Sequence, residues 1–563
     1  MSDPGIRRGT RRALSRRALL PAAAALLAGA AAACSSGGSA APATAASGGP
    51  APAPAGLVAT SPAAAGNLDT LTWDLPAGEP TTLDYVKAGD YSPDMVISNL
   101  CDSLLRLNPD FTFSPNLATS WRYGSGHQTL TFTLRSGVKF WDGHPLTSGD
   151  VAYSLLRNMN PKNSPVNGAF YANVASITAT GPHTVVVRFR HPDELFIKEM
   201  ATVAGDVAEE QFVKARGSRY GTAQGGVMCS GPLELARWSP GQSITLTANP
   251  HYWNPADRPR ARKVTLDFIT DTSSLVQALK SGAIQGAFEA PIAELPALQA
   301  DSSGRVYQGK SLAIYELATN SPGPDLKVRT ALSMVIDRSA MARVIFHSAA
   351  TPNYTLIPPA AWDPTALSTY QAALQALPRA TTVNTGAAKK LIAGDPAARQ
   401  PITLAILAGD QTEINTATLI QQEASTIGLT VTIKQLQPLQ FSNAFYVPSA
   451  RKGLGLILTK GYLDVPDPLD YLGLVVMPTS IFNWTHFDNA TVNKNVTEAQ
   501  STFDNARRAQ LITAAQARWE SAHFVIPLLS LHEVVFMNKA ITGAPVSFAY
   551  IYEPSLATVG AAK

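Results

Sequence analysis

Cysteine is scarce in this chain of 563 residues, and histidine is hardly more common. There are three cysteines, Cys34, Cys101 and Cys229, and nine histidines that lie scattered without the spacing of metal ligands. The two cysteines of the body cannot complete a metal site alone, and neither has a histidine near it in sequence to activate the thiol. We therefore predict no metal and no cofactor. In an oxidising compartment the pair favours a disulfide between Cys101 and Cys229, with two buried free thiols as the alternative.

Charge is also sparse. Charged residues make up 15% of the chain and the net charge is +4, yet six arginines fall within the first 17 residues. Without that segment the chain is close to neutral or slightly acidic, so no nucleic-acid partner is expected. Apart from one stretch near the N-terminus, the sequence has no long apolar run of the kind that spans a membrane.

That stretch, residues 18–33, is rich in alanine, follows the arginines and ends at Cys34. It is too short and too asymmetrically flanked for a spanning helix, which predicts a signal peptide over residues 1–33. Ala31-Ala32-Ala33-Cys34 resembles a lipobox, so we expect Cys34 to carry a lipid that holds the protein on the outer face of the cell membrane. Arg16-Arg17 resembles a twin-arginine signal, with the general secretion route as the alternative.

Residues 34–66 consist mostly of Ala, Pro, Gly and Ser. Such a segment cannot bury enough surface to offset its ordering entropy, so it is predicted to be a flexible tether. The remaining 500 or so residues exceed what one hydrophobic core usually holds, and they suggest two or three domains.

Strand and helix patterns alternate along the body without the even spacing of a barrel, which favours an α/β fold with two mixed lobes. The predicted strands are 71–75, 185–189, 243–248, 264–269, 431–433 and 524–529. The predicted helices are 93–105, a helix that starts after Thr147 or Ser148, 196–203, 208–215, 272–281 with Gly282 as its C-cap, 325–343, 413–427 and 505–522.

Enzyme motifs do not fit. The sequence from Gly304 to Ser311 matches a phosphate-loop pattern, but its flanks are strand-like where that loop needs a following helix. His532-Glu533 leads to Phe536 where a zinc protease needs a histidine. We predict that the protein is not an enzyme, and a secreted hydrolase is only a remote alternative.

The segment 130–156, LTFTLRSGVKFWDGHPLTSGDVAYSLL, carries a family resemblance. It resembles the signature of the extracytoplasmic solute-binding proteins of peptide and nickel ABC importers, the oligopeptide- and dipeptide-binding family 5. Further segments are similar to that family in the same order. They are 82–84, 99–105, 116–121, 229–232, 249–253, 279–284, 328–332, 336–338 and 526–528.

This resemblance implies a two-lobed, periplasmic-binding-protein-like α/β fold with mixed sheets and a hinge. Lobe I would comprise residues 67–320 plus 526–563, with an extra subdomain at about 101–182, and lobe II residues 321–525. The implied function is to capture a peptide in the cleft between the lobes and to deliver it to the permease and ATPase subunits of an importer. A receptor for an oligosaccharide or a metal chelate is the alternative. We expect a monomer.

The resemblance also implies where a peptide would bind. The loop from Gly461 to Pro468 is similar to the family's aspartate loop, and by position Asp464 would receive the peptide's amino terminus, flanked by Tyr462 and Asp467. From lobe I, the main chain of Gly89-Asp90-Tyr91 and of Ser230-Gly231 would pair with an extended ligand. The alternatives are a turn with two capping aspartates and two tight loops.

Overall fold

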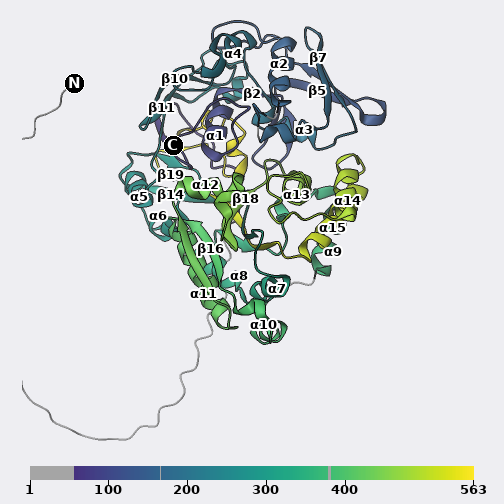
Figure 1. Ribbon diagram of the computed structural model, residues 1–563. Helices are drawn as coiled ribbons and strands as arrows, with labels where there is room; N and C mark the ends of the chain where they lie inside the picture. The colour runs from purple at the N-terminus through teal and green to yellow at the C-terminus, as the bar shows by residue number, and fades with distance from the viewer. Residues whose placement is uncertain (1–55, 161, 165, 378–381) are drawn as a thin grey trace, which may run out of the picture. The chain divides into compact units, whose positions relative to one another are not determined.

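The computed structural model describes residues 56–160, 162–164, 166–377 and 382–563 (Figure 1). The predicted signal peptide, the Cys34 anchor and the twin-arginine pair lie outside these residues. Within these ranges, the chain has no helix with the length and apolar character needed to cross a membrane.

One sheet of eleven strands runs through the body. Ten of its strands follow the order β10-β11-β12-β1-β13-β19-β14-β18-β16-β17, and β15 pairs with β19. The bounds are β10 Leu233–Ser239, β11 Ser243–Ala248, β12 Ala261–Asp267, β1 Leu68–Asp74, β13 Gly286–Ala287, β19 Val525–Asn538, β14 Gly304–Thr319, β18 Leu456–Tyr462, β16 Ile402–Leu407, β17 Val431–Leu436 and β15 Ala350–Pro352.

The two longest strands, β14 and β19, are antiparallel neighbours at the centre of this sheet. On one side they meet β13 and on the other β18, so they connect the strands of the predicted lobe I to those of lobe II. The segment Gly304–Ser311 that matches a phosphate-loop pattern is the first half of β14. Its prediction as strand is therefore confirmed.

A second sheet has four strands in the order β5-β6-β8-β7, with bounds Ala118–Tyr123, Thr129–Leu134, Thr184–Phe189 and Val174–Gly181. It occupies the region expected for the extra subdomain and extends to Phe189. The remaining strands form short pairs, β2 Asp102–Ser103 with β9 Asp206–Val207, β3 Leu105–Leu107 with β4 Phe113–Pro115, and β20 Ile541–Thr542 with β21 Gly560–Ala561.

The helices are distributed along the whole body. Their bounds are α1 Tyr91–Leu100, α2 Ser148–Asn158, α3 Phe196–Glu199, α4 Glu210–Arg216, α5 Thr272–Ser281, α6 Leu295–Gln299, α7 Leu326–Val335, α8 Arg338–Ala340, α9 Leu367–Ala376, α10 Thr385–Ile392, α11 Gln411–Ser425, α12 Pro438–Tyr446, α13 Pro468–Val476, α14 Ala490–Gln500 and α15 Asn505–Glu520.

Two helix boundaries follow directly from local chemistry. Thr147 caps α2 and forms a capping box with Asp150, in which each side chain accepts from the other residue's backbone amide. Gly282 ends α5 in the left-handed conformation at φ +77°, as the sequence predicts. Both predicted boundaries are confirmed.

The predicted single helix over residues 325–343 is wrong. Helix α7 ends at Val335, Ile336 is extended, and Asp337 caps the short α8 by accepting from the Ala340 amide at 2.8 Å. The buried Arg338 donates to the Pro527 carbonyl on β19 at 2.8 Å. This hydrogen bond from Arg338 to β19 coincides with the break between α7 and α8. The hydrophobic periodicity of the sequence does not predict a bond between such distant segments. The helix predicted over 93–105 likewise ends early, at Leu100, where the chain turns into β2.

The end of the predicted tether also differs. Residues 58–66 are bonded to the body: the amides of Val58, Ser61 and Ala65 donate to the carbonyls of Gln308, Ala544 and Ala561 at 2.9–3.0 Å. Ser61 is buried. Backbone pairing holds this stretch although its side chains are small, so among the described residues the tether ends near residue 57 rather than 66.

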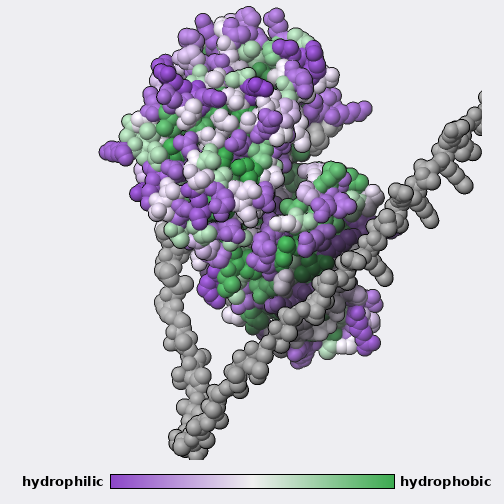
Figure 2. Space-filling view, turned by 90° about the vertical axis from the view of Figure 1, so that its left-hand side faces the viewer, coloured by the Kyte–Doolittle hydropathy of each residue, from purple (hydrophilic) through white to green (hydrophobic). Residues whose placement is uncertain are grey.

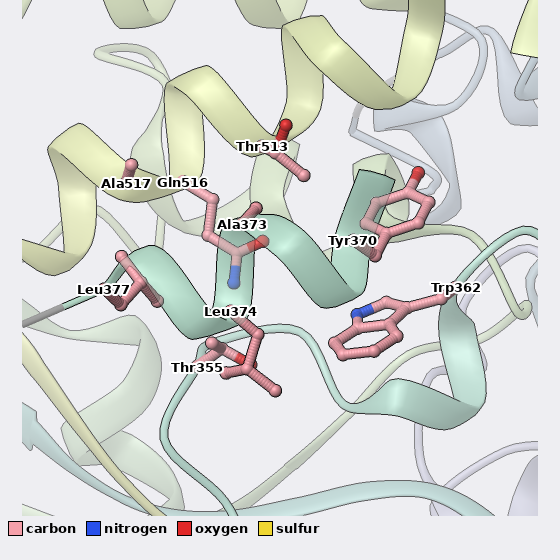
Figure 3. Close-up of a pocket in the computed structure, with 9 residues that line it drawn as sticks. All are labelled: Thr355, Trp362, Tyr370, Ala373, Leu374, Leu377, Thr513, Gln516 and Ala517. Atoms are coloured by element: carbon pink, nitrogen blue, oxygen red, sulfur yellow. The ribbon is translucent and has the colours of Figure 1, made fainter. Parts of the chain in front are cut away.

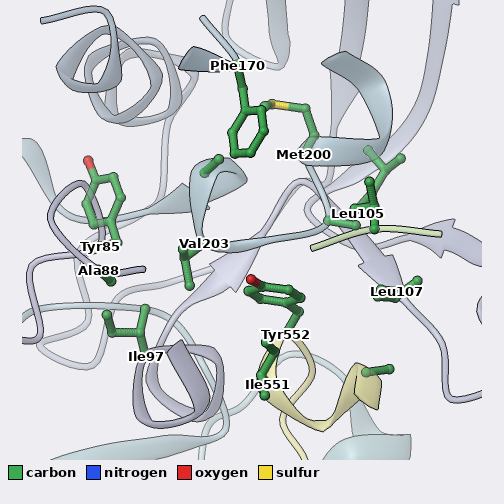
Figure 4. Close-up of a cluster of buried hydrophobic side chains, with 14 of the residues drawn as sticks. Tyr85, Ala88, Ile97, Leu105, Leu107, Phe170, Met200, Val203, Ile551 and Tyr552 are labelled. Carbon is green, nitrogen blue, oxygen red and sulfur yellow. The ribbon is translucent and has the colours of Figure 1, made fainter. Parts of the chain in front are cut away.

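The largest apolar cluster joins α1, the four-stranded sheet and the C-terminal segment. Figure 4 shows part of this cluster, with Val203 between the ring of Tyr552 below it and Phe170 and Met200 above it. In Figure 2, hydrophilic residues cover most of the face in view, with apolar patches mainly in its lower half.

Candidate functional site

The loop after β18 meets helix α1 and the C-terminal segment around residues 548–552. The Tyr462 ring lies 5.0 Å from the ring of Tyr91 and 5.4 Å from that of Phe548, measured between centroids. The Tyr552 hydroxyl donates to Oδ1 of Asp464. Three of the predicted ligand residues, Tyr91, Tyr462 and Asp464, thus lie together although they come from distant parts of the chain.

Asp464 is half-buried and does not cap a helix. Its backbone amide donates to Oδ2 of Asp470 at 2.5 Å, which fixes the turn that leads into α13. Burial raises the pKa of the Asp464 carboxyl to about 6, although the hydrogen bond from Tyr552 acts in the opposite direction. The side chain therefore lies among aromatic hydroxyls and other carboxyls, with no cation bound to it among the described residues.

Asp467 is placed differently. It caps α13 by accepting from the Leu469 amide at 2.9 Å, and its oxygens lie 2.5 Å from Lys198 Nζ and 2.8 Å from Arg508. It is 1% exposed, and the two cations hold its pKa well below the usual range against the opposing effect of burial. The predicted ligand role is not supported by this geometry, because the carboxylate is occupied by the protein itself. Asp467 therefore fits the alternative interpretation, in which the aspartate caps a helix.

The Gly89-Asp90-Tyr91 segment opens α1. Asp90 is its N-cap and accepts from the Tyr91 amide at 2.8 Å. The Tyr91 hydroxyl is buried and finds no hydrogen-bond partner in the described part of the chain, while Lys460 Nζ lies 4.6 Å from its ring centroid. Tyr91 therefore brings an unsatisfied hydroxyl to the site, and Asp90 serves mainly the helix.

Ser230 and Gly231 lie beside the other end of α1. Ser230 Oγ donates to Asp102 at 2.8 Å, and the Gly231 amide donates to the Leu100 carbonyl at 2.9 Å. A Cβ on Gly231 would stand 2.4 Å from that carbonyl oxygen. The neighbouring Cys229 is joined to Cys101 by a disulfide, with Cα atoms 4.8 Å apart. These contacts describe a tight loop tied to α1.

Sequence reasoning missed three buried carboxyls in this region, those of Asp94, Glu199 and Asp470. Oxygens of Glu199, Asp464 and Asp470 all lie within 4.8 Å of one another. Burial is the main cause that raises the pKa of Asp94, Glu199 and Asp470, and neighbouring carboxyls add to it. No motif marks them, because they converge from α1, α3 and α13 only in the folded chain.

A small pocket lies elsewhere, between α9 and α15 (Figure 3). Its walls include Trp362, Tyr370, Leu377, Thr513 and Gln516. It contains none of the predicted ligand residues, so we do not assign it to solute binding.

The sequence matches the family model "Bacterial extracellular solute-binding proteins, family 5 Middle" over residues 112–483, more than half of the chain. Among curated proteins it is 30% identical over 291 residues to Protein XP55 of Streptomyces lividans, covering 50% of this chain and 51% of the relative. It is 28% identical over 282 residues to the glutathione-binding protein GsiB of Escherichia coli K12, covering 50% and 54%. The chain spans about half the length of these relatives.

Solved structures confirm the predicted two-lobed α/β fold. The ABC transporter-associated periplasmic binding protein DppA of Helicobacter pylori, solved with the peptide STSA, superposes with a TM-score of 0.76 at 18% identity, covering 88% of this chain and 99% of its own. The murein tripeptide binding protein MppA of Escherichia coli gives 0.74 at 22% identity, covering 89% and 99%. At these identities the likeness establishes the fold.

Proposed function

Because this chain belongs to family 5 of the bacterial extracellular solute-binding proteins, we propose that it captures a peptide between two lobes and delivers it to an ABC importer. Membership in a family of binding proteins agrees with the expectation that it is not an enzyme. Its partners would be the peptide, the permease and the ATPase subunits.

The observation that carries the peptide assignment is the setting of Asp464. It is a half-buried carboxylate beside Tyr462 and Tyr552, and its neighbour Asp467 already satisfies the nearby cations Lys198 and Arg508. A peptide's ammonium would supply the positive charge that the surroundings of Asp464 lack, as a charge-assisted pair sheltered from water. Tyr91 would contribute its unsatisfied hydroxyl.

The lobes that we propose are residues 67–320 plus 526–563 and residues 321–525. The paired strands β14 and β19 support this division, because they are the long connections between the β13 side and the β18 side of the sheet. When the two lobes separate in a hinge motion, solute would reach residues that are buried in this structure.

The test is calorimetric titration of free and N-acetylated peptides. Asp464→Asn should weaken binding of a free peptide by about 2–5 kcal/mol, since the ammonium would be buried without its counter-charge. N-acetylated peptides should bind the wild type poorly. If free and acetylated peptides bind equally well, the proposed contact between Asp464 and the peptide's amine is wrong. If a sugar or a metal chelate binds and no peptide does, the protein is a receptor for that solute and the peptide proposal is wrong.

We further propose that the protein is a monomer anchored by a lipid on Cys34. Cys34→Ala should release the protein from membranes or leave it as unprocessed precursor, as fractionation would show. A Cys34→Ala protein that is processed and membrane-bound like the wild type would rule out this anchor. If export uses the twin-arginine route, Arg16→Lys with Arg17→Lys should block it, whereas unchanged export would assign the general route.

A further inference from the structure

Three carboxyls from two separate parts of the chain form a compact group around Asp464. Glu199 lies at the end of α3, and Asp470 in the first turn of α13. Glu199 is fully buried, and neither of its oxygens has a hydrogen-bond partner in the part of the chain that the structure describes. The same holds for Oδ1 of Asp470. Burying an unpaired carboxylate is costly, so burial favours the protonated form of these carboxyls until a cation binds beside them.

A fourth carboxyl reaches the same region from another helix. Asp94 lies in the first turn of α1, is 1% exposed and has no partner for either oxygen among the described residues. Burial is the largest cause that raises the pKa of Asp94, and the charge of Asp464 is the next. Asp94 is thus a second, independent buried carboxyl without a partner among the described residues, and a cation bound beside it would favour its ionised form.

The nearby cations cannot supply that charge. Lys198 and Arg508 are paired with Asp467 and Glu194 at 2.5–3.0 Å. Lys460 lies 2.7 Å from Glu289. Each of the three is paired with a carboxylate outside the group, so none of them is free to pair with the group or with Asp94.

We infer that the solute carries at least two positive charges, with one primary ammonium held by Glu199, Asp464 and Asp470 and a second cation next to Asp94. An ammonium has three N–H donors, and three acceptors at about 2.8 Å from its nitrogen stand roughly 4.6 Å apart. One oxygen from each of the three carboxyls lies within 4.8 Å of the others, so the three can contact one ammonium together. A peptide that begins with a basic residue has this chemistry, as does a polyamine. The inference rests on the proposed binding function and names its solute class.

The test compares lysylalanine with norleucylalanine, which has the same length and lacks the side-chain ammonium. By calorimetry, lysylalanine should bind the wild type at least about tenfold more tightly. Asp94→Asn should abolish this preference, and Glu199→Gln should weaken both dipeptides. Glu423→Gln, at a carboxyl on α11 that bonds the Asp337 amide, is the matched control and should leave both affinities unchanged. Thermal melting of each variant verifies that it is folded.

Further ligands separate this inference from the proposed function. If norleucylalanine binds as tightly as lysylalanine and both depend on Asp464, the dication inference is overturned while peptide binding stands. If spermidine binds and no dipeptide does, the dication inference stands and the peptide proposal fails. If calcium chloride alone binds the wild type, and this binding is lost in Glu199→Gln, the group is a metal site and the dication inference is overturned.

Discussion

Asp464 and Asp467 stand three residues apart in one loop and have opposite surroundings. Asp467 is the counter-ion of two buried cations, whereas Asp464 has none among the described residues. Asp467→Asn should therefore lower the free energy of unfolding by about 3–5 kcal/mol, because Lys198 and Arg508 would remain buried with Glu194 as their one shared carboxylate. Asp464→Asn should change it little. Denaturant unfolding of both variants measures the difference, and equal destabilisation would contradict it.

Asp74 gives a prediction on pH. It lies at the end of β1, nearly buried, with its Oδ1 accepting from the Ile269 amide at 3.0 Å. Burial, helped by the charge of Asp267, raises its pKa from 3.8 to about 7. Between those values the folded state holds a proton that the unfolded state releases, so this group's contribution to stability is present below about pH 4 and falls as pH rises towards 7.

Asp74→Asn removes that titration and keeps the acceptor for Ile269. Its free energy of unfolding should equal that of the wild type near pH 4 and exceed it by roughly 4 kcal/mol at pH 8, where the wild type must bury a charge. Chemical unfolding across this range measures the gap. A gap that stays constant with pH would show that Asp74 does not titrate in this way.

At residue level, the family resemblance named Asp464, Tyr462 and Tyr91 as expected ligand residues, and the fold brings these three together. It could not locate Asp94, Glu199 or Asp470, because an unpaired buried carboxyl is defined by what surrounds it. Nor could it distinguish Asp467 from Asp464, since the two cations that occupy Asp467 come from α3 and α15, far away in sequence.

At the level of elements, helix α2 offers a direct test of local chemistry. Its capping box joins the Thr147 hydroxyl to the Asp150 amide and the Asp150 carboxylate to the Thr147 amide. Thr147→Ala should cost about 1 kcal/mol of stability, because one amide of the first turn loses its acceptor. Thr147→Ser keeps the hydroxyl and should cost much less. If the two variants unfold at the same denaturant concentration, the cap contributes nothing measurable.

Elements with a complete local signal were predicted well, and those that depend on distant partners were not. Helix α5 has its periodicity and its Gly282 cap within one stretch of sequence. The break between α7 and α8 coincides with a bond from Arg338 to β19. The last residues of the supposed tether are held by backbone bonds to β14 and to the C-terminal segment, which composition does not encode.

For the molecule as a whole, the disulfide links segments 128 residues apart. Replacing both cysteines, Cys101→Ala with Cys229→Ala, should lower stability by about 2–5 kcal/mol, mainly because the unfolded chain gains freedom. Peptide mass mapping of the freshly purified wild type should find the two cysteines bridged. Two free thiols in that sample would refute the pairing.

The ion network around Asp467 gives the last prediction, because it joins the two proposed lobes. Lys198 and Glu194 come from proposed lobe I, and Asp467 and Arg508 from proposed lobe II, with all four side chains largely buried. Lys198→Met keeps the alkyl stem but leaves Asp467 with one cation fewer, so the contact should weaken and the solute-free protein should open. Small-angle X-ray scattering should then show a larger radius of gyration than for the wild type, and a saturating solute should reverse the change. Lys214→Met breaks the pair with Glu210 and the contact with the Tyr153 ring, both within proposed lobe I, and should scatter like the wild type. If Lys198→Met also scatters like the wild type without solute, the network stabilises the fold without controlling closure.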